Sequence, residues 1–218
     1  MFYIDRTVSL SDVGSEMKRR QNKKKDLQVG RIKEAALRLF SAKGFHNTTI
    51  SEISEAADIG KGTIYWYWNS KEELAFSLAS DMLSAFLELV EHARDDESSV
   101  FSRLKRLSNE VVDLYSREKD YCRLLLKFRA DRHYTFSPDY VEHVTASYSR
   151  IRAAIADIIA QGIRTGELIN VDAQFMAYII LGIVEGFEIE WLENEKDFKL
   201  QQGFDAVIGM MEKSLKLQ

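Results

Sequence analysis

The sequence of residues 35–74 is AALRLFSAKGFHNTTISEISEAADIGKGTIYWYWNSKEEL. Apolar residues recur at helical spacing before Gly44, which we expect to end a first helix. The sequence TISE at 49–52 has the spacing of a capping box and predicts the start of a short second helix. Residues 58–60 then separate this helix from a third one at about 61–68. A sharp turn between two short amphipathic helices is typical of a helix-turn-helix, whose second helix enters the major groove of DNA.

Basic charge gathers on the same part of the chain. Residues 17–71 contain 12 Lys and Arg against 5 Asp and Glu, whereas residues 72–218 contain 17 against 26. Residues 1–16 contain 1 against 3, and the whole chain has a net charge of −4. A basic segment joined to an acidic body is typical of a nucleic-acid-binding module attached to a different domain.

The rest of the chain is predicted to be helical as well. The whole chain of 218 residues includes 1 proline and 11 glycines, which are too few turn formers for a β-barrel or a β-sandwich. Apolar spacing and capping residues predict helices over about 70–92, 99–116, 121–128, 137–166, 172–191 and 199–215. We therefore expect an all-α fold in three parts: a flexible basic arm at 1–25, a three-helix helix-turn-helix domain at 26–71 and a larger helical domain at 72–218.

Several other classes of protein are disfavoured. Cys122 is the only cysteine, which excludes an internal disulfide, and in its apolar helix we expect inert core, with a redox sensor as the alternative. His133 and His143 lack the spacing of a metal site, and no phosphate loop or nucleophile elbow occurs, so we expect no metal, no cofactor and no enzymatic activity. Residues 1–16 lack the apolar core of a secretion signal, and no apolar run reaches the roughly 18 residues of a membrane span. A cytoplasmic protein without a membrane partner is expected, with Met17 as a second candidate for its first residue.

Residues 32–74 closely resemble the DNA-binding domain of the tetracycline-repressor (TetR) family of bacterial transcription regulators. The similarity lies in the Ala-Ala-x-x-Leu-Phe helix, the Gly-Phe turn, and the sequences Thr-Thr-Ile, Gly-Thr-Ile-Tyr-x-Tyr and Ser-Lys-Glu-Glu-Leu. Two positions depart from the family pattern: Asp58 stands where glycine is usual, and Gly60 where serine is frequent. Because aspartate tolerates the left-handed backbone conformation better than most residues, we expect the turn to survive.

The chemistry of the third helix and the resemblance point to the same DNA-binding residues. Lys61 at the helix entry suits a guanine or a phosphate, Gly62 lets the backbone approach the duplex, and Thr63 suits a base or a phosphate. The resemblance implies that Lys71, at a helix N-terminus, holds a phosphate together with the free amides. We expect DNA contacts from Thr49, Lys61, Gly62, Thr63, Tyr65, Trp66, Tyr67 and Lys71.

Each of these assignments has a structural alternative. The four aromatic residues at 65–68 would all pack the small domain, although four consecutive helical residues cannot all face one core. Thr49 would serve only as a helix cap. The basic arm would either follow a DNA groove, as homeodomain arms do, or be a solvated tail.

The resemblance implies that the larger domain binds a small-molecule effector and forms a homodimer through the last two helices. We expect an apolar or aromatic effector in a pocket lined by large side chains of the central helices. The candidates are Phe86, Tyr115, Phe128, Tyr148, Tyr178 and Phe187, each of which has plain core packing as its alternative. Glu185 and Glu188 would suit a cationic ligand, although an exposed charged face is the simpler interpretation.

The sequence thus predicts a DNA-binding transcription regulator, a repressor whose homodimer binds a palindromic double-stranded DNA operator and is released by a small molecule. One alternative is a DNA-binding regulator without a small-molecule effector. The other is a helical lipid carrier or enzyme in which the basic segment plays no part.

Overall fold

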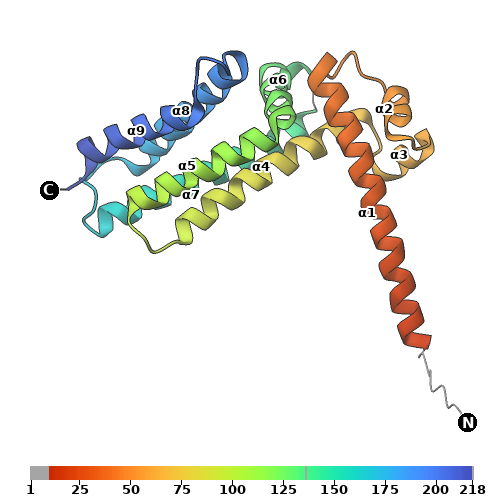
Figure 1. Cartoon of the computed structure of the whole chain (residues 1–218), viewed down its shortest axis with the longest axis horizontal. Coiled ribbons are helices and arrows are strands. Elements are labelled where there is room, and N and C mark those ends of the chain that lie inside the picture. Colours follow the sequence, from red (N-terminus) through yellow and green to blue (C-terminus); the bar gives the residue numbers. More distant parts are fainter. Residues whose placement is uncertain (1–9, 136, 218) are drawn as a thin grey trace, which may run out of the picture. The chain divides into compact units, whose positions relative to one another are not determined.

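The computed structural model describes residues 10–135 and 137–217. These residues form helices joined by short loops (Figure 1). In this described part, the one strand-like pairing is an isolated bridge between Leu168 and Lys216. The predicted all-α fold is therefore confirmed. The helices are α1 (Leu10–Lys43), α2 (Ile50–Ala57), α3 (Lys61–Tyr67), α4 (Lys71–Asp95), α5 (Val100–Arg117), α6 (Lys119–Thr135), α7 (Pro138–Arg164), α8 (Ala173–Glu193) and α9 (Leu200–Leu215).

The chain divides into two compact units between Ala75 and Phe76. The first unit contains α1, α2, α3 and the first residues of α4. The second contains the rest of α4 and the helices from α5 to α9. The boundary expected from the sequence, after Lys71, falls at the first residue of α4.

Helix α1 is much longer than the apolar spacing predicts. It begins at Leu10, whereas the spacing predicts a start near Asp26. The expectation of an irregular arm before Asp26 is therefore wrong for residues 10–25, and residues 1–9 of that arm lie outside the described residues. At 18–25, Lys, Arg and Gln favour the helix nearly as strongly as Ala does, so a helix anchored further along the chain extends through them without an apolar stripe.

The first unit is held by an apolar core that its helices share. Phe40 of α1, Ile53 of α2 and Ile64 of α3 are completely buried. Helices α2 and α3 have only 8 and 7 residues, which is too short for stability in water on their own. Their formation therefore depends on docking these apolar side chains against α1.

The turn between α2 and α3 depends on Asp58, which adopts the left-handed conformation at φ 52° and ψ 49°. The prediction that aspartate supports this turn is thus confirmed. The Asp58 N–H donates to the Glu55 carbonyl and the Ile59 N–H to the Ser54 carbonyl, both at 3.1 Å, which satisfies the free carbonyls at the end of α2. Arg31 of α1 adds an ion pair to the Asp58 carboxylate at 3.2 Å.

In the second unit, α5 packs against α9 and α7 packs against α8. Gly162 of α7 permits a close approach, because a Cβ there would lie 2.5 Å from Cγ2 of Val100. Two backbone hydrogen bonds tie the end of α9 to the connection between α7 and α8: Ile169 donates to the Leu215 carbonyl, and Leu217 to the Glu167 carbonyl. Among the described residues, no helix is long and apolar enough to span a membrane.

Candidate nucleic-acid interface

Helix α3 separates its aromatic residues between the core and the surface. Trp68, which follows the helix, is 7% exposed and Ile64 is completely buried, whereas Tyr65 is 53% and Trp66 70% exposed. The interpretation in which all four aromatics pack the domain is therefore wrong. Of the other predicted contact residues on α3, Lys61 and Gly62 are exposed and Thr63 is half-buried.

Tyr67 is half-buried and connects α3 to α1. Its hydroxyl donates to Oε1 of Gln28 at 3.2 Å. The Trp66 and Tyr67 rings meet edge to face with centroids 4.7 Å apart. The Lys25 ammonium lies 5.5 Å from the Trp66 ring centroid and 5.9 Å from that of Tyr67. A basic residue of α1 therefore lies beside the exposed aromatics of α3.

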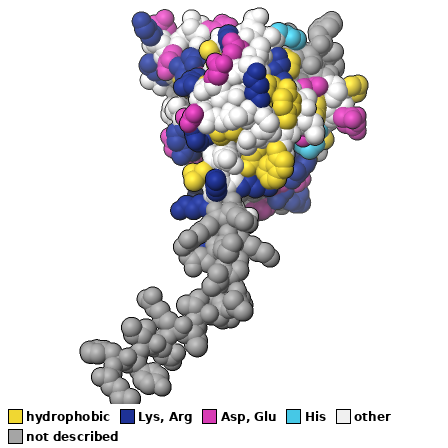
Figure 2. Space-filling model, turned by 90° about the vertical axis from the view of Figure 1, so that its right-hand side faces the viewer, with side chains coloured by type: hydrophobic (Ala, Val, Ile, Leu, Met, Phe, Trp, Pro, Cys, Tyr) yellow, Lys and Arg dark blue, Asp and Glu magenta, His cyan; other side chains and the backbone are white. Residues whose placement is uncertain are grey.

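The surface around α2 and α3 mixes apolar and basic side chains. Figure 2 shows the side of the first unit on which these two helices lie in Figure 1, with hydrophobic and Lys or Arg side chains next to each other. An aromatic surface with interspersed positive charge suits a partner that offers flat bases or methyl groups together with phosphates.

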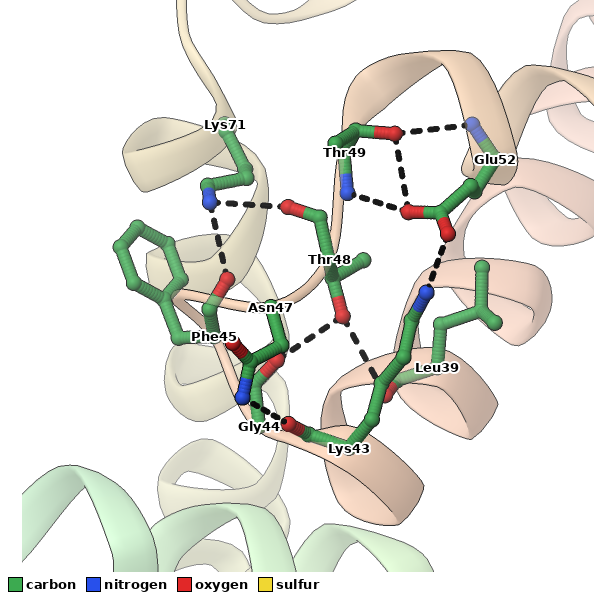
Figure 3. Close-up of polar contacts among 9 residues, drawn as sticks. All are labelled: Leu39, Lys43, Gly44, Phe45, Asn47, Thr48, Thr49, Glu52 and Lys71. Atoms are coloured by element: carbon green, nitrogen blue, oxygen red, sulfur yellow. Dashed lines mark hydrogen bonds and ion pairs between the residues drawn. The ribbon is translucent and has the colours of Figure 1, made fainter.

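The loop between α1 and α2 is held by hydrogen bonds to its own carbonyl groups (Figure 3). Thr48 is completely buried, and its hydroxyl lies 2.8 Å from the Gly44 carbonyl and 3.3 Å from that of Leu39. The Lys71 ammonium donates to the carbonyls of Phe45 and Thr48, each at 2.8 Å. It also lies 4.2 Å from the Phe45 ring centroid. These contacts attach the start of α4 to the loop that leads into α2.

This arrangement gives Lys71 a role inside the protein that the sequence did not predict. Burial lowers the pKa of its ammonium, and the nearby Glu52 carboxylate opposes this by raising it. At the helix start, Ser70 accepts from the Glu73 N–H at 3.0 Å, and the Glu73 carboxylate accepts from the Asn69 N–H. The phosphate contact expected of Lys71 stays a prediction.

Thr49 and Glu52 form the predicted capping box at the start of α2 (Figure 3). The Glu52 carboxylate accepts from the Thr49 N–H and hydroxyl, both at 2.8 Å, and also pairs with the Lys43 ammonium. The pKa of Glu52 is lowered to about 2, first by the hydrogen bond from Lys43 and then by those from Thr49. Capping therefore accounts for the position of Thr49, whose hydroxyl remains at the surface.

The second unit contains a small apolar cavity of about 60 Å³ between five of its helices. Ser108 is the one polar residue in its lining. The other lining residues are Phe86, Val90, Leu104, Leu107, Val111, Ile155, Ile180, Ile183, Val184, Phe204, Val207, Ile208 and Met211.

Of the six aromatic pocket candidates, Phe86 lines this cavity. Tyr115 is buried next to Phe86, with ring centroids 6.4 Å apart, and Phe128 is also buried. Tyr148 is half-buried, whereas Tyr178 is exposed under the Arg152 guanidinium. Phe187 packs on Phe198 and Phe204. The structure thus does not bring the six residues together around this cavity.

Residues 32–78 match the family model of bacterial regulatory proteins, tetR family. Residues 97–195 match the model of the tetracyclin repressor-like C-terminal domain. The chain belongs to the tetR family. As a member of this family, the protein is a DNA-binding transcription regulator, and the resemblance found in residues 32–74 is confirmed.

Individual relatives align with this tetR-family protein over most of their length. The fatty acid metabolism regulator protein of Bacillus subtilis (strain 168) is 20% identical over 190 residues, which are 87% of this chain and 96% of the relative. The transcriptional regulator FadR from Bacillus subtilis, solved with stearoyl-CoA, has a TM-score of 0.72 at 20% identity and covers 83% of this chain and 96% of its own. A regulator from Saccharomonospora viridis, solved with choline, has a TM-score of 0.73 at 21% identity and covers 87% and 98%.

Sequence reasoning missed two groups of residues in this tetR-family chain. Gln28 and Arg31 of α1 contact α3 and the turn before it, but they lie before the quoted motifs. The aliphatic residues of α5 and α9 that line the cavity follow a regular apolar stripe, which signals burial and not a cavity.

The Glu52 contacts predict that acid weakens the first unit. Since the folded-state pKa is lowered, the carboxylate stabilises the fold above its unfolded-state pKa of about 4.3, and this contribution is lost as the pH falls towards about 2. We expect Glu52→Gln to remove this part of the pH dependence. Urea unfolding would be followed by tryptophan fluorescence in a Trp191→Phe background, which leaves Trp66 and Trp68 as reporters on the first unit.

Glu55→Gln is the matched control, because the exposed Glu55 side chain forms no hydrogen bond within the described residues. It should keep the pH dependence of the parent between pH 4.3 and 2. If Glu52→Gln and Glu55→Gln unfold with the same pH profile, the capping box does not account for the acid response.

Proposed function

We propose that the protein is a repressor whose homodimer binds a palindromic operator and is released by an apolar small molecule. The observation that carries the DNA-binding part is the exposure of Tyr65 and Trp66 on a helix whose opposite side is fixed in the core. Adjacent exposed aromatics form an apolar patch of the kind that marks binding sites, and the neighbouring basic residues match the charge of DNA.

The proposed roles of the α3 residues follow from their positions. Lys61 and Thr63 stand in the first turn, where side chains suit base edges or phosphates. A Cβ at Gly62 would have open space around it, so the helix offers a flat surface at the point of closest approach. Tyr65 and Trp66 would contact thymine methyl groups or sugars beside these polar contacts.

A homodimer follows from the small size of one DNA-binding unit. A single module of this kind buries roughly 600–1,000 Å², which is little for tight specific binding, whereas two modules read half-sites about 34–36 Å apart. Helix α8 offers an exposed apolar face with open space above Gly182 and Gly186. Its exposed large residues are Phe175, Tyr178, Ile179 and Ile189, and Met210 of α9 is exposed too.

The apolar cavity supports an effector with a hydrocarbon chain. At about 60 Å³ it accepts a few heavy atoms as it stands, so a longer chain has to separate the helices that enclose it. A structural neighbour binds stearoyl-CoA, which contains such a chain, and a relative is named as a regulator of fatty acid metabolism. Because coupling is reciprocal, an effector that prefers the opened body lowers DNA affinity only if DNA prefers the closed one.

The DNA-binding proposal predicts that Trp66→Ala mainly weakens DNA binding and that Trp68→Ala mainly weakens the fold. Trp66→Ala should weaken operator binding about tenfold or more, as loss of one base or phosphate contact does, with a stability change of about 0.5 kcal/mol or less. Trp68→Ala should destabilise the first unit by about 3–5 kcal/mol, because it empties a buried site.

Fluorescence anisotropy on the DNA that flanks the protein's own gene, with scrambled duplex as competitor, measures the affinities, and urea unfolding measures the stabilities. If the parent binds both duplexes with equal affinity, the flanking DNA does not contain the operator. If Trp66→Ala binds the parent's preferred DNA as tightly as the parent does, the exposed face of α3 is not the reading surface.

The dimer proposal predicts that Ile179→Glu produces monomers, because it places a charge in the middle of the apolar face of α8. Sedimentation equilibrium measures the dissociation constant directly. Leu27→Glu is the matched control, since Leu27 is an exposed apolar residue of α1, in the first unit. A dimer that tolerates Ile179→Glu as well as Leu27→Glu would exclude this face as the interface.

The effector proposal predicts that stearoyl-CoA releases the parent from the operator and that Val207→Phe abolishes this release, since the added ring fills the cavity. Val112→Phe is the matched control, because Val112 lies outside the lining. Release by choline alone would contradict the hydrocarbon class. Release by neither compound, with normal operator binding, would favour a regulator without such an effector.

A further inference from the structure

The first half of α1 carries a dense run of positive charge. Residues 18–25 contain 6 Lys and Arg and no Asp or Glu. The side chains of Arg19, Lys23, Lys24 and Lys25 are exposed, and no carboxylate in the described part of the chain forms an ion pair with them. This run lies before residue 32, where the match to the tetR family model begins.

The basic run is continuous with the surface of α3. Lys25, its last residue, lies 5.5 Å from the centroid of the Trp66 ring. One turn further along α1, Gln28 accepts the hydrogen bond from Tyr67. A further turn on, Arg31 pairs with Asp58 in the turn before α3. Helix α1 is therefore fixed beside the recognition helix from residue 25 onwards, and the basic run extends from that point (Figure 1).

The charge pattern is unfavourable for an isolated helix. Arg19 and Lys23 are spaced four residues apart, as are Arg20 and Lys24, and like charges at this spacing repel each other on a helix. A polyanion alongside would neutralise these charges and remove the repulsion, so this helix half is better suited to an anionic partner than to water.

We propose that the basic run at 18–25 binds phosphates of the DNA next to the bases that α3 reads, so that each half-site is longer than α3 alone would contact. The proposal rests on the proposed function only in that α3 reads DNA. From Arg19 to Lys25 the helix rises about 9 Å, and duplex DNA carries one phosphate charge per roughly 1.7 Å of its axis, so several phosphates lie within reach. These contacts are to the backbone and add affinity without sequence preference.

The test is the salt dependence of DNA binding by Lys23→Gln/Lys24→Gln, which removes two exposed charges and leaves the Lys25 contact in place. The plot of log K against log salt should lose about 0.9 in slope for each lysine that no longer neutralises a phosphate. Affinity should fall by the same factor, about tenfold or more, for operator and scrambled duplex alike. Thermal unfolding checks that the variant keeps the stability of the parent.

Arg117→Gln/Lys196→Gln is the matched control, since it removes two exposed charges from the second unit. It should keep the slope of the parent. If Lys23→Gln/Lys24→Gln also keeps that slope on both duplexes, the proposal is overturned, whatever the operator preference of the parent. The operator assignment fails separately, if the parent does not distinguish the flanking DNA from scrambled DNA.

Anionic vesicles of phosphatidylglycerol separate DNA from the other polyanion that a basic helix attracts. We expect the parent to stay with the duplex when vesicles and DNA compete at equal charge concentration. If the two lysines contribute to vesicle binding while the DNA slope is unchanged, the run is a membrane-binding element and the proposal is wrong.

Discussion

The burial of Ile64 and Trp68 determines which side of α3 faces outwards. A helix of 7 residues has no stability of its own, so it forms only while these two side chains are docked in the core of the first unit. With 100° between successive residues, Tyr65 and Trp66 then have to point away from that core. The exposed aromatic surface is therefore a consequence of the same packing that makes the helix, and its position is as rigid as the core itself.

Two polar networks extend this constraint to the neighbouring helices. Lys71 holds the start of α4 to the carbonyls of Phe45 and Thr48, and Glu52 holds the start of α2 to Lys43 at the end of α1. Each network joins a helix end to a loop carbonyl or a charged partner, so neither depends on a large apolar area. A family resemblance assigns Lys71 to phosphate binding. Its two short hydrogen bonds within the unit give it a structural role whether or not DNA is bound.

Sequence reasoning succeeded where a feature depends on residues close together in the chain. The capping box of Thr49 and Glu52 and the left-handed Asp58 are decided by near neighbours. The helical conformation of residues 18–25 was missed, because Lys, Arg and Gln have helix propensity but form no apolar period. The cavity was missed for a different reason: its volume depends on how α5 and α9 pack against α7 and α8, which no single stripe reveals.

The proposed effector and dimer sites share one helix. Ile180, Ile183 and Val184 of α8 line the cavity, while Tyr178, Ile179 and Gly182 lie on its exposed face. Side chains on both faces of one helix shift together when the helix moves as a unit, because close-packed interiors transmit strain. A ligand that enlarges a cavity of about 60 Å³ has to displace α8 or the helices opposite it. In the proposed dimer, a displacement of α8 would change how the two copies pack, and this gives the ligand a route to alter the spacing of two DNA-binding units without touching either.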